Sequence, residues 1–122
     1  MLIDTCGWID FLRPGDGALA DPVERALADD LALMCSVSQA ELLHGVKGQK
    51  ELRQLELLFD NVILMDVEPA DWLSAGRALQ LLRGKGFKIP LTDALIASVA
   101  IRRGLVILTS DAHFGKLGAV LA

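Results

Sequence analysis

Short apolar runs alternate along the chain with longer segments of helical periodicity. Four runs rich in aliphatic residues predict buried strands at 1–4, 31–36, 62–67 and 105–111. Between and after them, amphipathic patterns predict helices, with one or two helical turns at 7–13 and longer helices at 21–30, 38–45, 50–59, 70–86 and 91–104. This alternation predicts an α/β fold, a three-layer α/β/α sandwich with a mostly parallel central sheet, and residues 1–122 are expected to form a single domain.

Several boundaries can be predicted from capping chemistry. Asp21 followed by Pro22 is typical of a helix start, and Thr92 is the expected cap of the helix over 91–104. Gly104 is the expected stop of that helix. The final segment, GAVLA at 118–122, is expected to add at most a short fifth strand.

Composition narrows the class of protein. Hydrophobic residues make up 52% of the chain and aromatic residues 5%, so the core is expected to be aliphatic. No apolar stretch reaches the roughly 20 residues that span a bilayer, and Asp4 interrupts the start, so we expect no membrane segment, no signal peptide and a cytoplasmic location. Cys6 and Cys35 match no zinc or redox spacing and are expected to be reduced thiols.

Charge is unevenly distributed along the chain. The net charge of −4 argues against a nucleic-acid binder held by phosphate contacts alone. The window between Asp71 and Asp93 nevertheless contains no acidic residue and several basic ones: Arg77, Arg83, Lys85 and Lys88. The segment RGKGFK at 83–88 is therefore either a phosphate-contacting rim or a solvated helix end.

Four acidic residues stand at equivalent places in the predicted fold. Asp4 ends the first strand, Asp111 follows the fourth, and Glu41 and Asp93 lie in the first turns of two helices. Because open α/β sheets bind ligands beyond the carboxyl ends of their strands, we expect these carboxylates to share one edge.

Each of these residues also has a local explanation. Ser38 and Glu41 have the spacing of a capping box, and Asp93 and Asp111 favour helix N-termini or turns. A single shared site explains all four residues, Asp4 included, with one cause. Two unit charges about 4 Å apart repel by roughly 4 kcal/mol at an effective dielectric near 20. A bare cluster would therefore have to take up protons or splay apart, and a hard divalent cation resolves the repulsion.

Oxygen ligands of this kind favour Mg²⁺ or Mn²⁺. His44 and His113 are not spaced as a paired metal motif, and His113 is expected to pack or cap near the turn after the fourth strand. Carboxylate-bound magnesium leaves positions for water and a substrate phosphate, so the predicted chemistry is phosphodiester hydrolysis. The hydroxyls of Thr5, Thr109 and Ser110 either orient a ligand or make local turn hydrogen bonds.

Four motifs in order along the chain resemble one family: MLIDTCGWIDFL, SVSQAELLHG, IPLTDALIASVAIRRG and VILTSDAHFGKL. Together they resemble the PIN domain and, more closely, VapC-type toxins of bacterial toxin–antitoxin modules. The resemblance implies a Mg²⁺- or Mn²⁺-dependent endoribonuclease that acts on structured RNA such as tRNA or rRNA. It implies that the acidic quartet of Asp4, Glu41, Asp93 and Asp111 is catalytic and metal-binding, and that Thr109 is the threonine of a T-x-D motif.

The resemblance also implies partners. Typical members form homodimers and are neutralised by a cognate VapB-type antitoxin whose C-terminal segment occupies the active-site groove. Leucines on 50–59 and 72–82 either form such a dimer face or pack within the domain.

Two alternative functions can be weighed against the nuclease. An aspartyl-phosphate phosphatase would need an aspartate two residues after Asp4, but that position is Cys6, so this function is disfavoured. A PIN-like RNA- or partner-binding protein with little turnover is the alternative from another class, and the complete acidic quartet argues against it.

Overall fold

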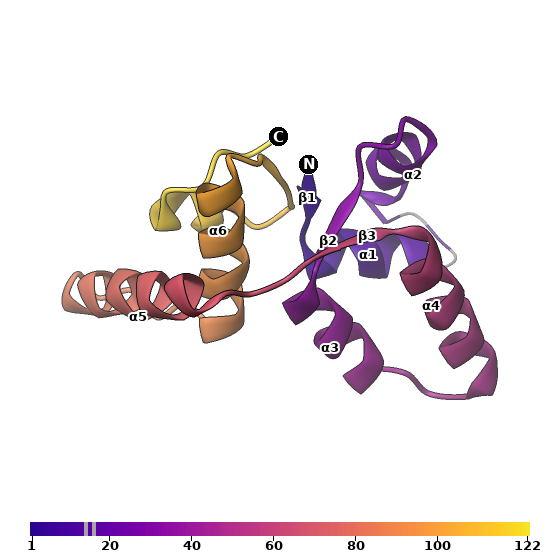
Figure 1. The fold of residues 1–122 in the computed structure, drawn as a ribbon, viewed down its shortest axis with the longest axis horizontal. Coiled ribbons are helices and arrows are strands. Elements are labelled where there is room, and N and C mark those ends of the chain that lie inside the picture. The colour runs from indigo at the N-terminus through magenta and orange to yellow at the C-terminus, as the bar shows by residue number, and fades with distance from the viewer. Residues whose placement is uncertain (14, 16) are drawn as a thin grey trace.

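The structure, a computed structural model, describes residues 1–13, 15 and 17–122, and its elements alternate between strands and helices (Figure 1). The strands are short, and the helices contain most of the residues in regular secondary structure. In chain order the elements are β1 (Leu2–Ile3), α1 (Thr5–Leu12), α2 (Ala20–Ala28), β2 (Leu33–Cys35), α3 (Ser36–His44), α4 (Gln49–Asn61), β3 (Ile63–Met65), α5 (Pro69–Gly84), α6 (Leu91–Arg103), β4 (Ile107–Leu108) and the 3₁₀ helix η1 (Ala112–Leu117).

The four strands form one parallel sheet in the order β3-β2-β1-β4. The predicted α/β class and parallel sheet are therefore confirmed. Strand β1 lies inside the sheet, where Leu2 pairs with Leu33 on one side and Ile107 on the other. The expected fifth strand is reduced to an isolated parallel bridge between Ile107 and Leu121.

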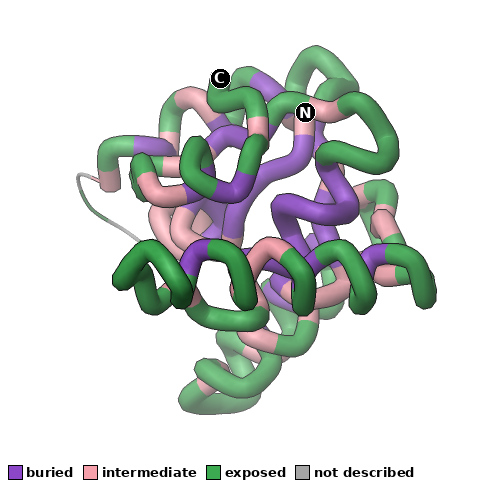
Figure 2. Tube along the Cα trace, turned by 90° about the vertical axis from the view of Figure 1, so that its left-hand side faces the viewer, coloured by how far each residue is buried: buried purple, intermediate pink, exposed green. Residues whose placement is uncertain are grey.

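Successive residues of a strand point to opposite faces, and this alternation builds two hydrophobic cores. Leu2 and Ile107 belong to the core shared with α5, α6 and η1. Ile3 and Leu108 belong to the core shared with α1, α2 and α4. The sheet is thus covered on both faces, and the buried part of the chain runs through its centre (Figure 2).

Helix α6 is the most deeply buried helix, because every residue from Ala94 to Ala100 is buried. It lies between the sheet and α5, which packs across its outer side (Figure 1). Gly104 ends α6 in the left-handed conformation at φ 66°, which confirms the predicted stop. The predicted cap is wrong: Pro90 is the N-cap, and Thr92 lies inside the first turn.

The start of α2 also differs from the prediction. The helix begins at Ala20 after Leu19, so Asp21 is a first-turn residue and not the cap. An acidic residue in the first turn favours the helix through its dipole, which explains why Asp21 indicates a helix start two residues later than the observed one.

An ion pair between buried Asp71 and exposed Arg102 joins the start of α5 to the end of α6. Asp71 is 1% exposed, and its two carboxylate oxygens accept hydrogen bonds from Nε and Nη2 of Arg102, each at 2.8 Å. The Glu68 N–H donates to the same carboxylate at 2.8 Å, which completes a capping box at the start of α5. These bonds lower the pKa of Asp71, chiefly through Arg102.

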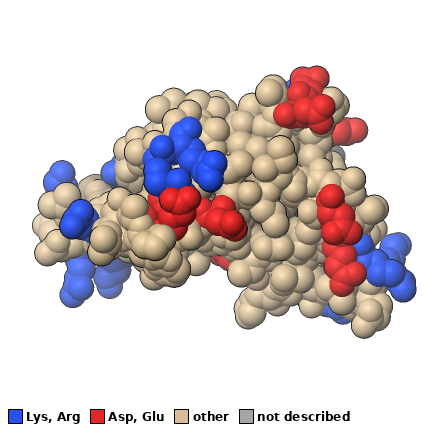
Figure 3. All heavy atoms as spheres, in the orientation of Figure 1, with Lys and Arg blue, Asp and Glu red and all other residues tan. Residues whose placement is uncertain are grey.

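Charged side chains are unevenly distributed on the face shown in Figure 3. Lysine and arginine side chains lie at the outer end of α5 and acidic side chains gather over α2, whereas both signs lie side by side elsewhere on this face. Within the residues described, no helix is both long enough and apolar enough to cross a bilayer.

Candidate metal and catalytic site

Asp4 is the residue that directly follows β1, and its side chain is almost fully buried. It caps α1 by accepting the Thr5 N–H at Oδ1, 2.7 Å away. Its Oδ2 accepts the hydroxyl of Thr109 at 2.9 Å and the thiol of Cys6 at 3.1 Å. With only 5% of Asp4 exposed, these donors replace the water that a buried carboxylate loses.

Glu41 lies on α3 and is joined to Asp4 through Thr5. The Thr5 hydroxyl donates to Glu41 Oε1 at 2.7 Å and lies 2.9 Å from the hydroxyl of buried Ser38. The capping-box explanation of Glu41 is wrong, because α3 begins at Ser36 after Cys35 and Ser38 lies inside the helix. The Glu41 side chain therefore does not cap α3.

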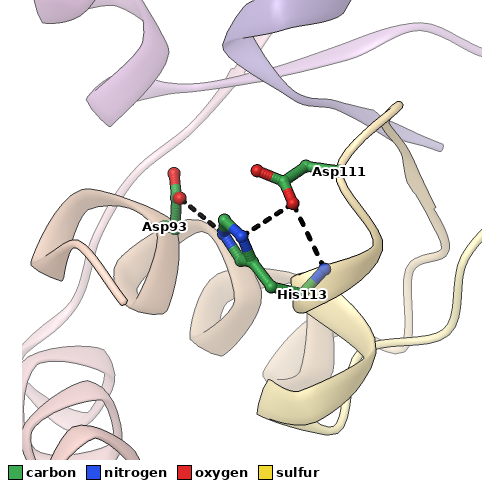
Figure 4. Close-up of side chains that lie close together, drawn as sticks. All are labelled: Asp93, Asp111 and His113. Carbon is green, nitrogen blue, oxygen red and sulfur yellow. Dashed lines mark hydrogen bonds and ion pairs between the residues drawn. The ribbon is translucent and has the colours of Figure 1, made fainter. Parts of the chain in front are cut away.

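Asp93 and Asp111 approach each other across an imidazole ring (Figure 4). His113 Nε2 lies 2.7 Å from Asp93 Oδ2, and His113 Nδ1 lies 2.7 Å from Asp111 Oδ1. Asp111 also caps η1 by accepting the His113 N–H at 3.2 Å. Since a neutral imidazole has one N–H, the two contacts together require either the doubly protonated ring or a proton on one carboxyl group.

The charges of three acidic residues act on one another. Burial raises the pKa of Asp93 above its ordinary value, and the hydrogen bond with His113 opposes that rise. The negative charges of Asp4 and Asp111 raise the pKa of Asp93 further. The structure therefore brings Asp4, Asp93 and Asp111 into one electrostatic site, although they lie far apart in the sequence.

Thr109 connects the two halves of the site. Directly after β4, its hydroxyl donates to Asp4 and accepts the N–H of Asp111 at 3.0 Å. A continuous chain of polar contacts thus runs from Asp4 through Thr109 to Asp111 and His113. Ser110 lies 3.5 Å from the Cys6 thiol at the same edge.

The carboxylate oxygens of these acidic residues are suited to bind a hard divalent cation. Carboxylate oxygens are the ligands that Mg²⁺ and Mn²⁺ prefer, and crowded carboxylates are stabilised by positive charge. Among the described residues, one side-chain atom each of Asp93, Asp111 and His113 lies within 4.8 Å of the other two, so the two carboxylates are close enough together to bind one ion. Asp4 and Glu41 stand outside this tightest group and join it through Thr109 and Thr5.

His113 is the member of the site that the sequence reasoning missed. The sequence predicts that it packs or caps, and its ring does stack on Phe114, with centroids 5.3 Å apart. The sequence pattern does not predict its contacts with the two carboxylates. The usable signal was its position two residues after Asp111 in the turn beyond a strand.

The basic segment 83–88 is exposed and is tied to η1 by one contact. Nζ of Lys116 lies 3.9 Å from the centroid of the Phe87 ring, a cation–π geometry. This contact joins the segment that holds Arg83, Lys85 and Lys88 to the helix that carries His113. The two cysteines are both free thiols, as expected.

Comparisons with known proteins cover almost the whole chain. The sequence profile described as PIN domain matches residues 1–120. The chain is 30% identical over 124 residues to VapC ribonuclease Mb1587 of Mycobacterium bovis, covering 98% of this chain and 92% of the relative. Ribonuclease VapC11 of Mycobacterium tuberculosis gives the same identity and coverage.

Solved structures share the fold at lower identity. DNA-bound VapBC from Salmonella typhimurium matches with a TM-score of 0.81 at 19% identity, covering 98% of this chain and 93% of that one. VapBC2 from Rickettsia felis, bound to a promoter DNA fragment, matches with a TM-score of 0.79 at 17% identity over 99% and 96% of the two chains. Mycobacterium tuberculosis VapC20, a Sarcin-Ricin loop cleaving toxin, matches with a TM-score of 0.75 at 19% identity over 99% and 97%.

Proposed function

Because this chain belongs to the PIN-domain family and is of the VapC type, we propose that it is an endoribonuclease toxin that cleaves RNA with Mg²⁺ or Mn²⁺. Residues 1–122 form one PIN-like domain in this proposal. The observation that carries it is the meeting of carboxylates from distant parts of the chain at one sheet edge, where Asp93 and Asp111 converge on His113 and Thr109 hydrogen-bonds to both Asp4 and Asp111. Such a concentration of negative charge is costly for a domain whose total stability is on the order of 5–15 kcal/mol, unless it serves a cation.

Asp4 and Asp93 are the principal metal ligands in this proposal, directly or through water. Asp111 completes the set or holds a second ion, and Glu41 binds the ion or orients the attacking water. A bound divalent cation supplies charge neutralisation at the phosphate and lowers the pKa of a water molecule.

The protein's own groups prepare this chemistry before any substrate arrives. Thr109 holds the Asp4 carboxylate in place through its 2.9 Å hydrogen bond. Thr5 holds one oxygen of Glu41, which leaves the other oxygen to accept a proton or a hydrogen bond from water. Fixed orientation of this kind lowers the entropic cost of the reaction.

RNA approaches along the basic segment 83–88 in this proposal. Arg83, Lys85 and Lys88 are exposed, and the Phe87–Lys116 contact ties their segment to the helix next to Asp111. The substrate class is structured RNA, such as tRNA or rRNA. Local positive charge at the rim explains how a chain of net charge −4 binds a polyanion.

The proposed partners are a VapB-type antitoxin and a second copy of the chain. A homodimer is supported by apolar residues on the outer face of α5, where Leu73 is 61% and Leu81 is 68% exposed. Trp72, on another side of the same helix, is 54% exposed. A cytoplasmic location completes the proposal, since its RNA target and antitoxin are intracellular.

Cleavage assays on purified RNA test the proposal. Asp4→Asn and Asp93→Asn keep the shape of each side chain and remove its charge, so magnesium-dependent cleavage should be abolished while the fold persists. Asp60→Asn, at an exposed position of α4, is the matched control and should cleave normally. Retained cleavage in both site variants would refute the assignment, and a wild-type protein that binds RNA without cutting it would support a binding protein instead.

A further inference from the structure

His113 is placed between two carboxylates in a way that packing alone does not require. Both ring nitrogens face carboxylate oxygens at 2.7 Å, one from α6 and one from the segment between β4 and η1. The two carboxylates belong to separate parts of the chain, 18 residues apart in numbering, and the ring is the group that spans them (Figure 4).

Each carboxylate uses one oxygen for the ring and keeps the other. Asp93 binds the ring through Oδ2 and Asp111 through Oδ1. Within the described residues, Asp93 Oδ1 and Asp111 Oδ2 accept no hydrogen bond, and Figure 4 shows these two oxygens turned away from the ring nitrogens. Each side chain therefore retains a lone-pair-bearing oxygen for a ligand.

The ring itself is held by the core. It stacks on Phe114 with an interplanar angle of 21°, and Phe114 is fully buried. Stacking on buried Phe114 thus orients the imidazole ring, and the positions of its two nitrogen atoms are defined before any ion binds. Groups that hydrogen-bond to metal-binding side chains fix the orientation of those side chains and raise metal affinity.

We propose that His113 is a positioning residue of the metal site, which holds Asp93 and Asp111 at the separation that a divalent cation requires. The inference rests on the proposed function, because it concerns the same site. The histidine acts through the two carboxylates and does not touch the ion or the RNA.

Replacement of His113 by phenylalanine isolates this role. His113→Phe keeps an aromatic ring on Phe114 and removes both nitrogen contacts, whereas His113→Gln keeps an N–H donor. His44→Ala, at an exposed position of α3, is the matched control. Loss of a group that orients metal ligands typically weakens metal binding about 10- to 100-fold.

Mn²⁺ binding, measured by electron paramagnetic resonance without RNA, is the primary readout. We expect His113→Phe to bind Mn²⁺ about 10- to 100-fold more weakly, His113→Gln to lose less, and His44→Ala to match the wild type. In cleavage assays the His113→Phe protein should need more Mg²⁺, with kcat at saturating Mg²⁺ and KM for RNA close to wild type. A residue that merely stabilises the fold would change the melting temperature and leave the Mn²⁺ affinity unchanged.

Several results would overturn the proposal. These are Mn²⁺ affinity within twofold of wild type in His113→Phe, equal losses in the Phe and Gln variants, or a ¹⁴N coupling that shows direct coordination of bound Mn²⁺ by the imidazole. Normal Mn²⁺ binding with cleavage lost at every Mg²⁺ concentration would also overturn it. If His113→Phe does not fold, the Mn²⁺ affinity of His113→Gln against wild type decides the question. A wild-type protein that binds no divalent cation refutes the proposed function itself, which separates the two failures.

Discussion

Thr109→Val is the substitution that tests the polar network most sharply. Valine has nearly the shape of threonine but lacks the hydroxyl that donates to Asp4 Oδ2 at 2.9 Å and accepts the Asp111 N–H at 3.0 Å. The change therefore removes two hydrogen bonds without leaving a cavity. Asp4 stays buried, with the Thr5 N–H and the Cys6 thiol as its remaining donors.

The cost follows from the burial of Asp4. A hydrogen bond to a charged group contributes about 1.5–3 kcal/mol, and Thr109 is itself half-buried, so we expect a loss of about 2 kcal/mol in the free energy of unfolding. For a chain of 122 residues this corresponds to a decrease in Tm of roughly 6–10 °C. Because Asp4 becomes less well oriented, Mn²⁺ affinity should fall about 10-fold or more as well.

Thermal and urea unfolding of the metal-free protein measure this effect directly. Thr109→Ser, which keeps the hydroxyl and loses only a methyl group, is the matched control and should cost less than about 1 kcal/mol. If Thr109→Val melts within a degree of both the wild type and Thr109→Ser, the hydroxyl does not support Asp4 and the reasoning is wrong.

Three further predictions concern other parts of the molecule. The pKa of Asp71 is lowered in the folded state, so its ionised carboxylate stabilises the fold at pH values above the ordinary carboxyl pKa. This contribution is lost as the pH falls through about 4 and below. Asp71→Asn should therefore lower the free energy of unfolding at pH 7 and make that free energy depend less on pH in the acid range. Reversing the charge at Lys85 and Lys88 should weaken RNA binding and reduce its salt dependence. Unchanged affinity in a filter-binding titration would show that the segment 83–88 does not contact RNA. Leu81→Asp should convert the proposed dimer to monomers in sedimentation velocity, whereas an unchanged mass would show that this face of α5 is not the dimer interface.

The fold was largely predictable because its signals are local. Short aliphatic runs predicted all four strands, and Gly104 predicted the end of α6 correctly. Capping residues were less informative. Thr92 and Asp21 are good cap types, yet backbone geometry placed the caps at Pro90 and Leu19, where no side-chain hydrogen bond is made.

The site was predictable only as far as it depends on topology. Because parallel strands end at one edge, the positions of Asp4, Asp93 and Asp111 in the chain implied that they meet. The imidazole between Asp93 and Asp111 depends on the path of the turn after β4, which hydrophobic patterning does not specify. The pairing of Asp71 with Arg102 likewise depends on how α5 crosses α6.

Binding of Mn²⁺ to the purified protein by isothermal titration calorimetry, with the Asp4→Asn/Asp93→Asn double variant alongside, tests the central claim most directly. The account predicts saturable binding to the wild type, reversed by a chelator, and none to the double variant. Equal binding by the two proteins, or no specific binding by the wild type, would contradict the claim that these distant carboxylates gather around a cation.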